Sequence, residues 1–414
     1  MGLIEQLKIV KKSAMQLLNI DEVKKIEILN VLAEKLEENM NLIIEQNKLD
    51  LAKMSIQDPK YDRLELNKER IIAIANDVRK VALLESPLNK ILEQRQLPNG
   101  IELSKKTVPL GVVAVIYESR PNVTIDVFSL CFKSGNAIVL KGGSDAYYSN
   151  LALVDIIKQS LLASGLADDI VHLMPTDRQA MYDLLNATGY IDVCIPRGSQ
   201  ALIQFVRDNA KIPVIETGAG IVHTYVDASA DNEIAKQVIY NAKTRRVSVC
   251  NALDCLVLHQ SKLSDLVEMV KPLADKQVII YADRLSYKQL MGSYPVDLLR
   301  LASSESFGCE FLDYKLAIKT VADTEQAIEH IAKFSSGHSE AIIANDNLAI
   351  EQFTNLVDAA VVYVNVSTAF TDGGEFGLGA EIGISTQKLH ARGPMALAEL
   401  TSYKWIAIGN GQVR

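Results

Sequence analysis

The sequence has no excess of basic residues. Its 414 residues include 43 lysines and arginines against 51 aspartates and glutamates, which gives a formal net charge of −8. A chain with this balance has no basic field that would release counterions from nucleic acid, so we exclude nucleic acid as a partner. An anionic substrate would therefore have to be held by locally placed cations.

Long apolar runs are also absent. No stretch reaches the roughly 18 to 20 residues of a membrane span, and the N-terminal MGLIEQLKIVKK lacks the apolar core and cleavage site of a signal peptide. We therefore expect no membrane association and a cytoplasmic location.

The chain has few cysteines and histidines, and they do not form metal-binding patterns. The five cysteines contain no CxxC pair, and the six histidines show no ligand spacing near them, so we expect no metal site. An odd cysteine number without an export signal favours reduced thiols, which either react or fill the core as small apolar groups. The cysteines are Cys131, Cys194, Cys250, Cys255 and Cys309.

The ordinary dinucleotide-binding fingerprint is missing, because no GxGxxG follows an early strand. In its place, Lys141, Gly142, Gly143 and Ser144 lie between an apolar, strand-like run and a helical stretch. Backbone N–H groups, a lysine and a serine hydroxyl at such a position can bind a phosphate. A plain turn explains the same residues equally well.

The apolar residues that are present predict an α/β chain. Residues 3–95 show the three-and-four spacing of helices, and beyond residue 100 short β-rich runs alternate with helical stretches. The runs 111–116 and 137–140 are apolar on both faces, as central parallel strands are. Since 414 residues exceed the size at which one core keeps growing, at least two domains are expected. Strands of the second domain are predicted at 255–258, 278–281, 316–319 and 341–343.

Two segments combine residue types suited to catalysis. Three cations, Lys243, Arg245 and Arg246, closely precede Cys250, and cationic neighbours favour a reactive thiolate. A solvated helix face would carry the same charges. After the run 112–117, Pro121 fixes a turn and Asn122 follows it. The turn either presents the Asn122 amide to a ligand or is a simple loop.

The order of these segments resembles the aldehyde dehydrogenase superfamily and, within it, the branch whose members reduce γ-glutamyl phosphate. The resemblance runs from about residue 107 to 414. The matching blocks are VPLGVVAVIYESRPNVTIDVFSLCFKSGNAIVLKGGSDA, PRGSQALI, IPVIETGAGIVHTYVD, NAKTRRVSVCNALDCLVLH and EFGLGAEIGISTQKLHARGP. Two departures affect loop geometry: Val247 and Ser248 replace the usual Pro-Gly before Val-Cys, and Ala396 replaces a glycine.

The resemblance implies an aldehyde-dehydrogenase-like α/β fold. It predicts a cofactor domain on an open, mostly parallel sheet, a second α/β domain with the catalytic cysteine, and a small β arm for oligomerisation. We expect the cofactor domain at 1–225 with a return of the chain at about 345–395, and the catalytic domain at 226–344. The oligomerisation strands are expected at 96–108 and 396–414.

The resemblance also implies the roles of individual residues. Cys250 is expected to be the nucleophile, with Asn122 supplying an amide to the oxyanion. Glu216 matches the acid that activates water in hydrolytic relatives, a role that a reaction without hydrolysis does not need. The residues expected to bind the cofactor are Lys141, Ser144, Ser199, Gly218 and Glu310.

The implied reaction is the NADPH-dependent reduction of L-glutamyl 5-phosphate to L-glutamate 5-semialdehyde and phosphate through a thioester, a step of proline biosynthesis. The leaving phosphate requires cations. The candidates are Arg120, Lys243, Arg245, Arg246 and Arg392.

Two other functions remain open at this point. The chain could oxidise another small aldehyde to its acid with NAD(P), in which case Glu216 would act as a base, or it could be a silent binding protein on the same fold. As a partner we expect a second copy of the chain, in a homodimer or larger homo-oligomer. Association with glutamate 5-kinase, which makes the unstable substrate, is left open by the sequence.

Overall fold

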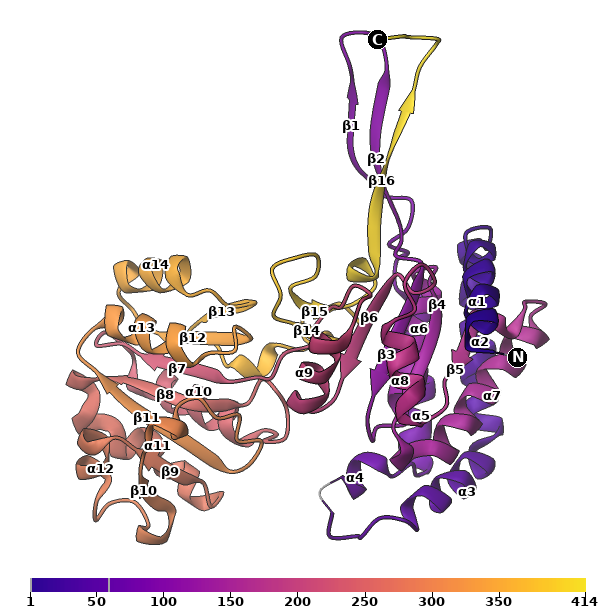
Figure 1. The fold of residues 1–414 in the computed structure, drawn as a ribbon. Helices are drawn as coiled ribbons and strands as arrows, with labels where there is room; N and C mark the ends of the chain where they lie inside the picture. Colours follow the sequence, from indigo (N-terminus) through magenta and orange to yellow (C-terminus); the bar gives the residue numbers. More distant parts are fainter. Residues whose placement is uncertain (1, 59) are drawn as a thin grey trace. The chain divides into compact units, whose positions relative to one another are not determined.

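The protein consists of two compact units, which we describe from a computed structural model covering residues 2–58 and 60–414 (Figure 1). Unit 1 comprises residues 1–217, 377–383 and 394–414, and unit 2 comprises residues 218–376 and 384–393. Each unit contains a parallel sheet with helices, which confirms the predicted α/β class. No described helix combines the length and apolarity of a membrane-spanning segment.

The first part of unit 1 is helical, as the periodicity predicts. In α2 the side chains of Ile28, Leu29, Leu32 and Leu36 are fully buried along one face, and Asp21 caps the helix by accepting from the Lys24 N–H. The helices are α1 (Leu3–Leu17), α2 (Glu22–Glu38), α3 (Met40–Leu51), α4 (Tyr61–Leu64) and α5 (Lys68–Leu83).

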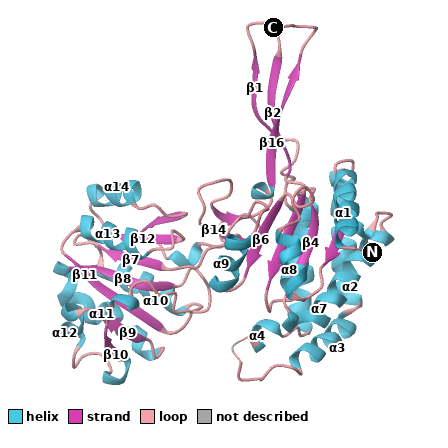
Figure 2. Ribbon diagram, viewed as in Figure 1, coloured by secondary structure: helices cyan, strands magenta, loops and turns pink. Residues whose placement is uncertain are grey.

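The prediction of helix up to residue 95 is wrong at its end, because β1 (Ile91–Gln96) is a strand. It pairs antiparallel with β2 (Glu102–Pro109), which in turn pairs with β16 (Thr401–Ile408), and the three form a separate sheet of unit 1 (Figure 2). All six residues of β1 are exposed, so the strand has no buried face and no periodicity that would identify it. The strands expected for oligomerisation exist; their role stays a prediction.

The main sheet of unit 1 has the strand order β5-β4-β3-β6, with all pairs parallel. The chain builds β3, β4 and β5 in one direction and then crosses to the other side of β3 for β6. The carboxyl ends of β3 and β6 therefore flank a topological switch point, where open α/β sheets bind ligands. The strands are β3 (Val112–Tyr117), β4 (Ala137–Gly142), β5 (Val171–Leu173) and β6 (Val193–Arg197), and the helices are α6 (Asn122–Lys133), α7 (Tyr147–Ala163), α8 (Arg178–Leu185) and α9 (Gln200–Asn209).

Unit 2 is built on a seven-stranded parallel sheet with the order β10-β9-β11-β8-β7-β12-β13. Alternate residues of β8 enter two separate cores: Leu256 and Leu258 pack with α10 and α11, whereas Cys255 and Val257 pack with α13 and α14. The strands are β7 (Val222–Val226), β8 (Leu253–His259), β9 (Ile279–Ala282), β10 (Leu299–Leu301), β11 (Lys315–Val321), β12 (Ser339–Ile343) and β13 (Val361–Val364), and the helices are α10 (Asn232–Thr244), α11 (Leu266–Asp275), α12 (Arg284–Leu290), α13 (Thr324–Phe334) and α14 (Asn347–Leu356). Two short strands, β14 (Gly383–Ser385) and β15 (Gly393–Met395), form a further sheet.

The unit boundaries differ from the expected domain limits. The division falls between residues 217 and 218 rather than 225 and 226, because β7 belongs to the sheet of unit 2. Residues 345–376 also stay in unit 2, since β13 pairs with β12 there. The chain returns to unit 1 only at 377–383 and from 394 onward.

Candidate active site

The loops after β3, β4 and β6 meet at the switch point of unit 1. The Glu118 carboxylate accepts hydrogen bonds from the Ser199 hydroxyl at 2.8 Å and the Ser199 N–H at 2.9 Å. A side chain at Gly198 would place its Cβ 2.7 Å from the Glu118 carboxyl carbon, so glycine is needed for this approach. Ser199 also caps α9 by accepting from the Leu202 N–H. Glu118, which sequence reasoning missed, thus fixes the position of Ser199.

The residues predicted to bind the adenosine ribose lie at the end of β4. Lys141 is buried in the strand, and this burial lowers the pKa of its ammonium, against the opposing effect of Asp177. Ser144 is exposed at the start of a short 3₁₀ helix. Beside this strand end, Gly142, Asn150 and Asp177 contribute to the walls of a cavity of about 430 Å³. The lysine ammonium and the serine hydroxyl can donate hydrogen bonds to a nucleotide, and the adjacent cavity offers space for one.

Asp145 is held by neighbouring side chains. Its carboxylate accepts a hydrogen bond from the Ser119 hydroxyl at 3.0 Å, and the Lys60 ammonium lies 4.0 Å away. The sequence could not show this, since Ser119 is on the loop after β3 and Lys60 lies near the N-terminus of α4.

Asn122 is the first residue of α6 and is oriented by its own helix. Its amide nitrogen donates to the Asp126 carboxylate, one turn further along, at 2.8 Å. Burial raises the pKa of Asp126 to about 7, although the bond from Asn122 opposes the shift. The sequence analysis missed Asp126, although its i, i+4 spacing from Asn122 was visible.

In unit 2, Cys250 lies half-buried in the loop between α10 and β8. The neighbouring Asn251 anchors this loop. Its side-chain amide nitrogen donates to the carbonyl oxygens of Ala369 and Thr371, at 3.3 and 3.0 Å, and its backbone carbonyl accepts from the Thr368 hydroxyl at 2.9 Å. The side chain of Asn251 is 5% exposed, so these bonds form in the interior. The backbone of the predicted nucleophile is thus fixed on its C-terminal side.

Three predicted site residues of unit 2 come together around Gly220. A Cβ on Gly220 would overlap the carbonyl group of Cys250, so the two backbones are in direct contact. The Gly220 N–H donates to Glu310 Oε1 at 2.8 Å. Gly218, two residues earlier, packs so closely that an added Cβ would lie 2.7 Å from the Thr386 hydroxyl. The structure therefore brings Gly218, Cys250 and Glu310 to one region of unit 2, with Gly220 as a contact residue that the sequence analysis did not single out.

The other four thiols are in unfavourable surroundings for a nucleophile. Burial raises the pKa of Cys131 and Cys255, and raises that of Cys194 to about 12. The pKa of Cys309 is also raised, first by burial and then by nearby carboxylates. A raised pKa keeps a thiol protonated and lowers its reactivity.

The cations proposed for the phosphate differ in their surroundings. The prediction of Lys243 as a phosphate ligand is corrected, because its side chain is fully buried. Its ammonium donates to the Leu253 carbonyl at 2.8 Å and lies 3.9 Å from Asp254. Burial lowers its pKa to about 8, which further argues against a phosphate ligand.

The remaining cations are at least partly exposed. Arg245 and Arg246 are exposed just after α10, and Arg120 is half-buried. Arg392 forms an ion pair with Asp358 at 2.7 Å. Glu216, the acid matched to hydrolytic relatives, pairs with Arg207 at 3.5 Å within unit 1.

Comparisons with known proteins agree with this geometry. Residues 10–289 match the aldehyde dehydrogenase family. The chain is 60% identical to the γ-glutamyl phosphate reductase of Legionella pneumophila (strain Paris) over 99% of this chain and 98% of that one, and 57% identical to that of Chlorobium phaeobacteroides (strain BS1) over 99% and 98%.

Solved structures extend the comparison to the fold. The crystal structure of the γ-glutamyl phosphate reductase from Thermotoga maritima, at 39% identity, matches with a TM-score of 0.96 over 100% of this chain and 99% of that one. An acetylating aldehyde dehydrogenase from Geobacillus thermoglucosidasius, at 18% identity and a TM-score of 0.70 over 99% and 97%, shares the fold. With full-length relatives at this identity, the chain belongs to the γ-glutamyl phosphate reductases of the aldehyde dehydrogenase family.

Proposed function

We propose that this chain reduces L-glutamyl 5-phosphate to L-glutamate 5-semialdehyde and phosphate, with NADPH as the hydride donor and Cys250 as the nucleophile. The activity is that of a γ-glutamyl phosphate reductase, an oxidoreductase of proline biosynthesis that uses a nicotinamide cofactor. The observation that supports the proposed chemistry best is the fixed Cys250 loop, which packs against Gly220 and is anchored through Asn251.

In the first step, Cys250 forms a thioester. Its thiolate attacks the acyl carbon, a C–S bond forms, and the C–O bond to the phosphate breaks. The anchored loop holds the sulfur in one place, which favours attack because it removes positional freedom in advance. The four other thiols, with raised pKa values, are poor competitors.

Asn122 is proposed to stabilise the oxyanion. One N–H of its amide donates to Asp126, so the orientation of the amide group is fixed and its second N–H can serve another acceptor. A donor held in place before the reaction costs little reorganisation when charge develops. Of the proposed phosphate ligands, Lys243 is internal and is no longer a candidate, whereas Arg120, Arg245, Arg246 and Arg392 remain candidates.

We propose that the cofactor binds in unit 1, at the carboxyl ends of its parallel strands. When bound, NADPH supplies the hydride that converts the thioester to the aldehyde and releases the Cys250 thiolate. We assign the adenosine ribose and its 2′-phosphate to Lys141 and Ser144, because a cation and an uncharged hydroxyl suit a phosphate group. The Asp145 carboxylate would repel that phosphate. The hydrogen bond from the Ser119 hydroxyl and the ion pair with Lys60 restrain this carboxylate from turning toward the ribose.

The test is an assay in the reverse direction. Purified enzyme with glutamate semialdehyde and NADP⁺ should reduce the cofactor only when inorganic phosphate is present, and an alkylating agent should abolish this activity. Reduction of the cofactor without phosphate, with the free acid as product, would instead establish an aldehyde oxidation in which Glu216 is the base. Absence of any turnover together with absence of NADPH binding would establish a silent protein.

We further propose that the sheet of β1, β2 and β16 joins two copies of the chain. Large side chains are exposed on its strands, among them Ile91, Tyr403 and Trp405, and its outer strands have unpaired edges. Sedimentation of the parent and of a chain with Tyr403 and Trp405 both changed to lysine tests this: the parent should be a dimer or larger, the variant a monomer. A monomeric parent would contradict the proposal. Association with glutamate 5-kinase is tested by co-sedimentation of the two purified enzymes.

A further inference from the structure

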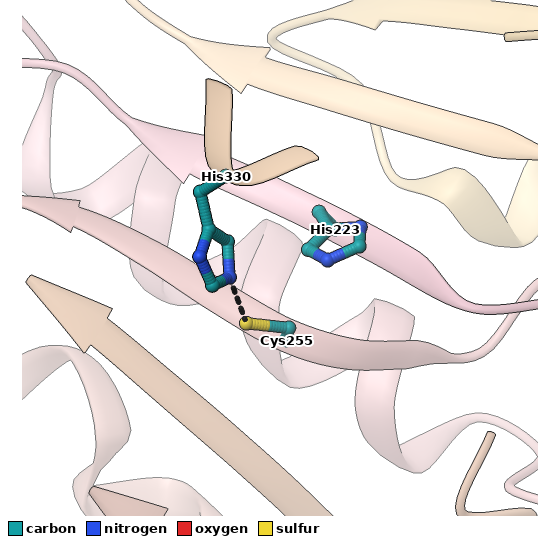
Figure 3. Close-up of side chains that lie close together, drawn as sticks. All are labelled: His223, Cys255 and His330. Carbon is teal, nitrogen blue, oxygen red and sulfur yellow. Dashed lines mark hydrogen bonds between the residues drawn. The ribbon is translucent and has the colours of Figure 1, made fainter. Parts of the chain in front are cut away.

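Three potential metal ligands lie together inside unit 2, apart from every residue assigned to the reaction. His223 on β7 and Cys255 on β8 are register partners, so their side chains leave the same face of the sheet. Helix α13 packs against β8 and supplies His330 (Figure 3). The ligand atoms of all three lie within 4.8 Å of one another, and Cys255 Sγ lies 3.6 Å from His330 Nε2.

A buried carboxylate orients one of the histidines. Glu340 on β12 is fully buried and is the register partner of His223 on the other side of β7. Its carboxylate lies 3.1 Å from His223 Nδ1 and also accepts from the His223 N–H at 2.9 Å and from the Ser335 hydroxyl. The Nδ1 side of the ring is thereby satisfied, which leaves Nε2 as the atom that faces the cluster. This carboxylate–histidine arrangement is the one that commonly supports metal-ligating imidazoles.

The arrangement leaves a buried polar atom unsatisfied. His223 is 0% exposed, and its Nε2 has no hydrogen-bond partner within residues 2–58 and 60–414. Neither protonation state removes the problem, because Nε2 would carry either an unused lone pair or an unused N–H. Buried polar groups without a partner are rare and call for a missing ligand or ion.

We propose that His223 Nε2, Cys255 Sγ and His330 Nε2 bind one Zn²⁺ ion. Imidazole nitrogen and thiolate sulfur are the donors that zinc prefers, at about 2.0 to 2.1 Å and 2.3 Å, and a tetrahedral angle between such bonds puts sulfur and nitrogen about 3.6 Å apart. Cys255 Sγ and His330 Nε2 already have this separation. The zinc site is inferred independently of the proposed reaction.

The charges of the site also balance with zinc. On binding, the Cys255 S–H bond breaks, its proton leaves to solvent and an S–Zn bond forms. The two positive charges of the ion then meet one thiolate and the Glu340 carboxylate. Without an ion, this fully buried carboxylate has no lysine or arginine at ion-pair distance anywhere in the part of the chain that the structure describes.

The surroundings point to a structural role for this ion. The rings of Phe307 and Phe334 pack on His330, with centroids 5.2 and 4.8 Å away. All three ligands are buried, so a substrate cannot reach the ion from solvent. His223 follows Gly220 by three positions and Cys255 follows Cys250 by five. The ion would therefore link β8, which follows the nucleophile loop, to β7, which follows the Gly220 segment that contacts this loop.

Zinc content and zinc affinity test the proposal on the full chain. The work uses Cys250→Ser as the parent, so that the reactive half-buried thiol does not bind the metal. After chelation and titration with Zn²⁺ alone, monitored by competition with a chromophoric chelator, we expect one tight site per chain and a higher melting temperature with zinc. Co²⁺ should give a thiolate-to-cobalt charge-transfer band.

Variants separate this site from adventitious binding. Adding Cys255→Ser or His330→Gln should abolish the tight site, the cobalt band and the zinc-dependent rise in melting temperature, whereas Cys194→Ser, a buried cysteine of unit 1, should keep all three. Glu340→Gln should weaken zinc binding by about 10- to 100-fold.

Failure of the folded parent to bind zinc tightly overturns the proposal without recourse to any variant. Equal zinc binding by the parent and His330→Gln also overturns it, and this result does not depend on whether Cys255→Ser folds.

Discussion

Replacing Gly220 with alanine tests how strictly the position of Cys250 limits the reaction. The added Cβ would overlap the Cys250 carbonyl group and lie 2.7 Å from its Cα. Those atoms are backbone, so the loop has no flexible side chain that could move aside. The added Cβ would lie 1.6 Å from the Cys250 carbonyl oxygen. The Cys250 backbone must therefore shift by about 1.5 to 2 Å to reach normal contact. The φ angle of Gly220 is not in the left-handed region, so this contact is the reason that alanine is disfavoured.

The expected loss follows from that displacement. A misplacement of about 1 Å can already cost about 10²-fold in rate, which corresponds to about 2.7 kcal/mol of transition-state stabilisation, so the larger shift should cost at least this much. The extra volume should also lower the free energy of unfolding by about 1 to 3 kcal/mol. Because the attacking atom is affected more than the cofactor, kcat should fall while NADPH affinity changes little.

The assay compares kcat for phosphate-dependent NADP⁺ reduction with the rate at which iodoacetamide alkylates Cys250. Gly374→Ala is the matched control, since among the described residues its added Cβ would approach only Asp372 Oδ1, the tip of a side chain, at 3.1 Å. The control should keep nearly parental kcat. If Gly220→Ala has parental kcat and an unchanged alkylation rate, the close contact between the two backbones does not position the nucleophile.

Other predictions address the remaining site residues. Cys250→Ala should lower turnover more than about a thousandfold while NADPH still binds, whereas Cys309→Ala should stay active; substantial turnover without Cys250 would refute its role. Asn122→Ala should lower kcat by about 10²- to 10³-fold with a smaller change in KM, and an unchanged kcat would remove it from the oxyanion site. The pKa of Asp126 is about 7 in the folded chain against an ordinary value of 3.8, so as the pH rises the unfolded chain loses this proton first and the free energy of unfolding falls between these two values. Asp126→Asn should therefore raise the melting temperature above pH 7 but not near pH 4. Melting temperatures of the variant and the parent that run parallel across this pH range would contradict the shift. Ser144→Glu should move the NADPH to NADH ratio of kcat/KM by tenfold or more toward NADH, and an unmoved ratio would exclude this loop from cofactor choice.

The sheets could be predicted from sequence because their strands are buried on both faces. Every residue of β3 and β4 is buried, which produces the continuous apolar runs that mark central parallel strands. The strand β1 could not be predicted, since it is exposed along its length and depends on pairing with a partner strand. The unit boundary at 217 depends on which sheet accepts β7, and local sequence does not encode that choice.

The site was only partly visible in the sequence. Cys250, Gly218 and Glu310 could be singled out through resemblance, and the structure brings them to one region of unit 2. Lys243 was predicted as a candidate ligand of the phosphate, but it lies four residues after the buried Ile239 and thus on the same, buried face of α10. Glu118 has no motif of its own, because its role depends on a loop 81 residues away.

The histidine and cysteine cluster shows a further limit of spacing rules. Zinc motifs are recognised when two ligands lie within a few residues of each other on one turn. His223, Cys255 and His330 come from three different elements and meet only through strand register and helix packing. Their order along the chain therefore gave no reason to expect a metal.

The connectivity of the two units has a consequence for biosynthesis. A ribosome completes all of unit 2 before it makes residues 394–414, which belong to unit 1 and include β16. Until then β2 lacks a neighbour on one side, and the nascent chain presents an unpaired edge that can capture other strands. Pairing of β16 with β2 is a contact between segments separated by residues 110–400, so it is expected among the last and slowest events of folding. A chain released before β16 is made would contain all of unit 2 but could not complete the three-stranded sheet of unit 1.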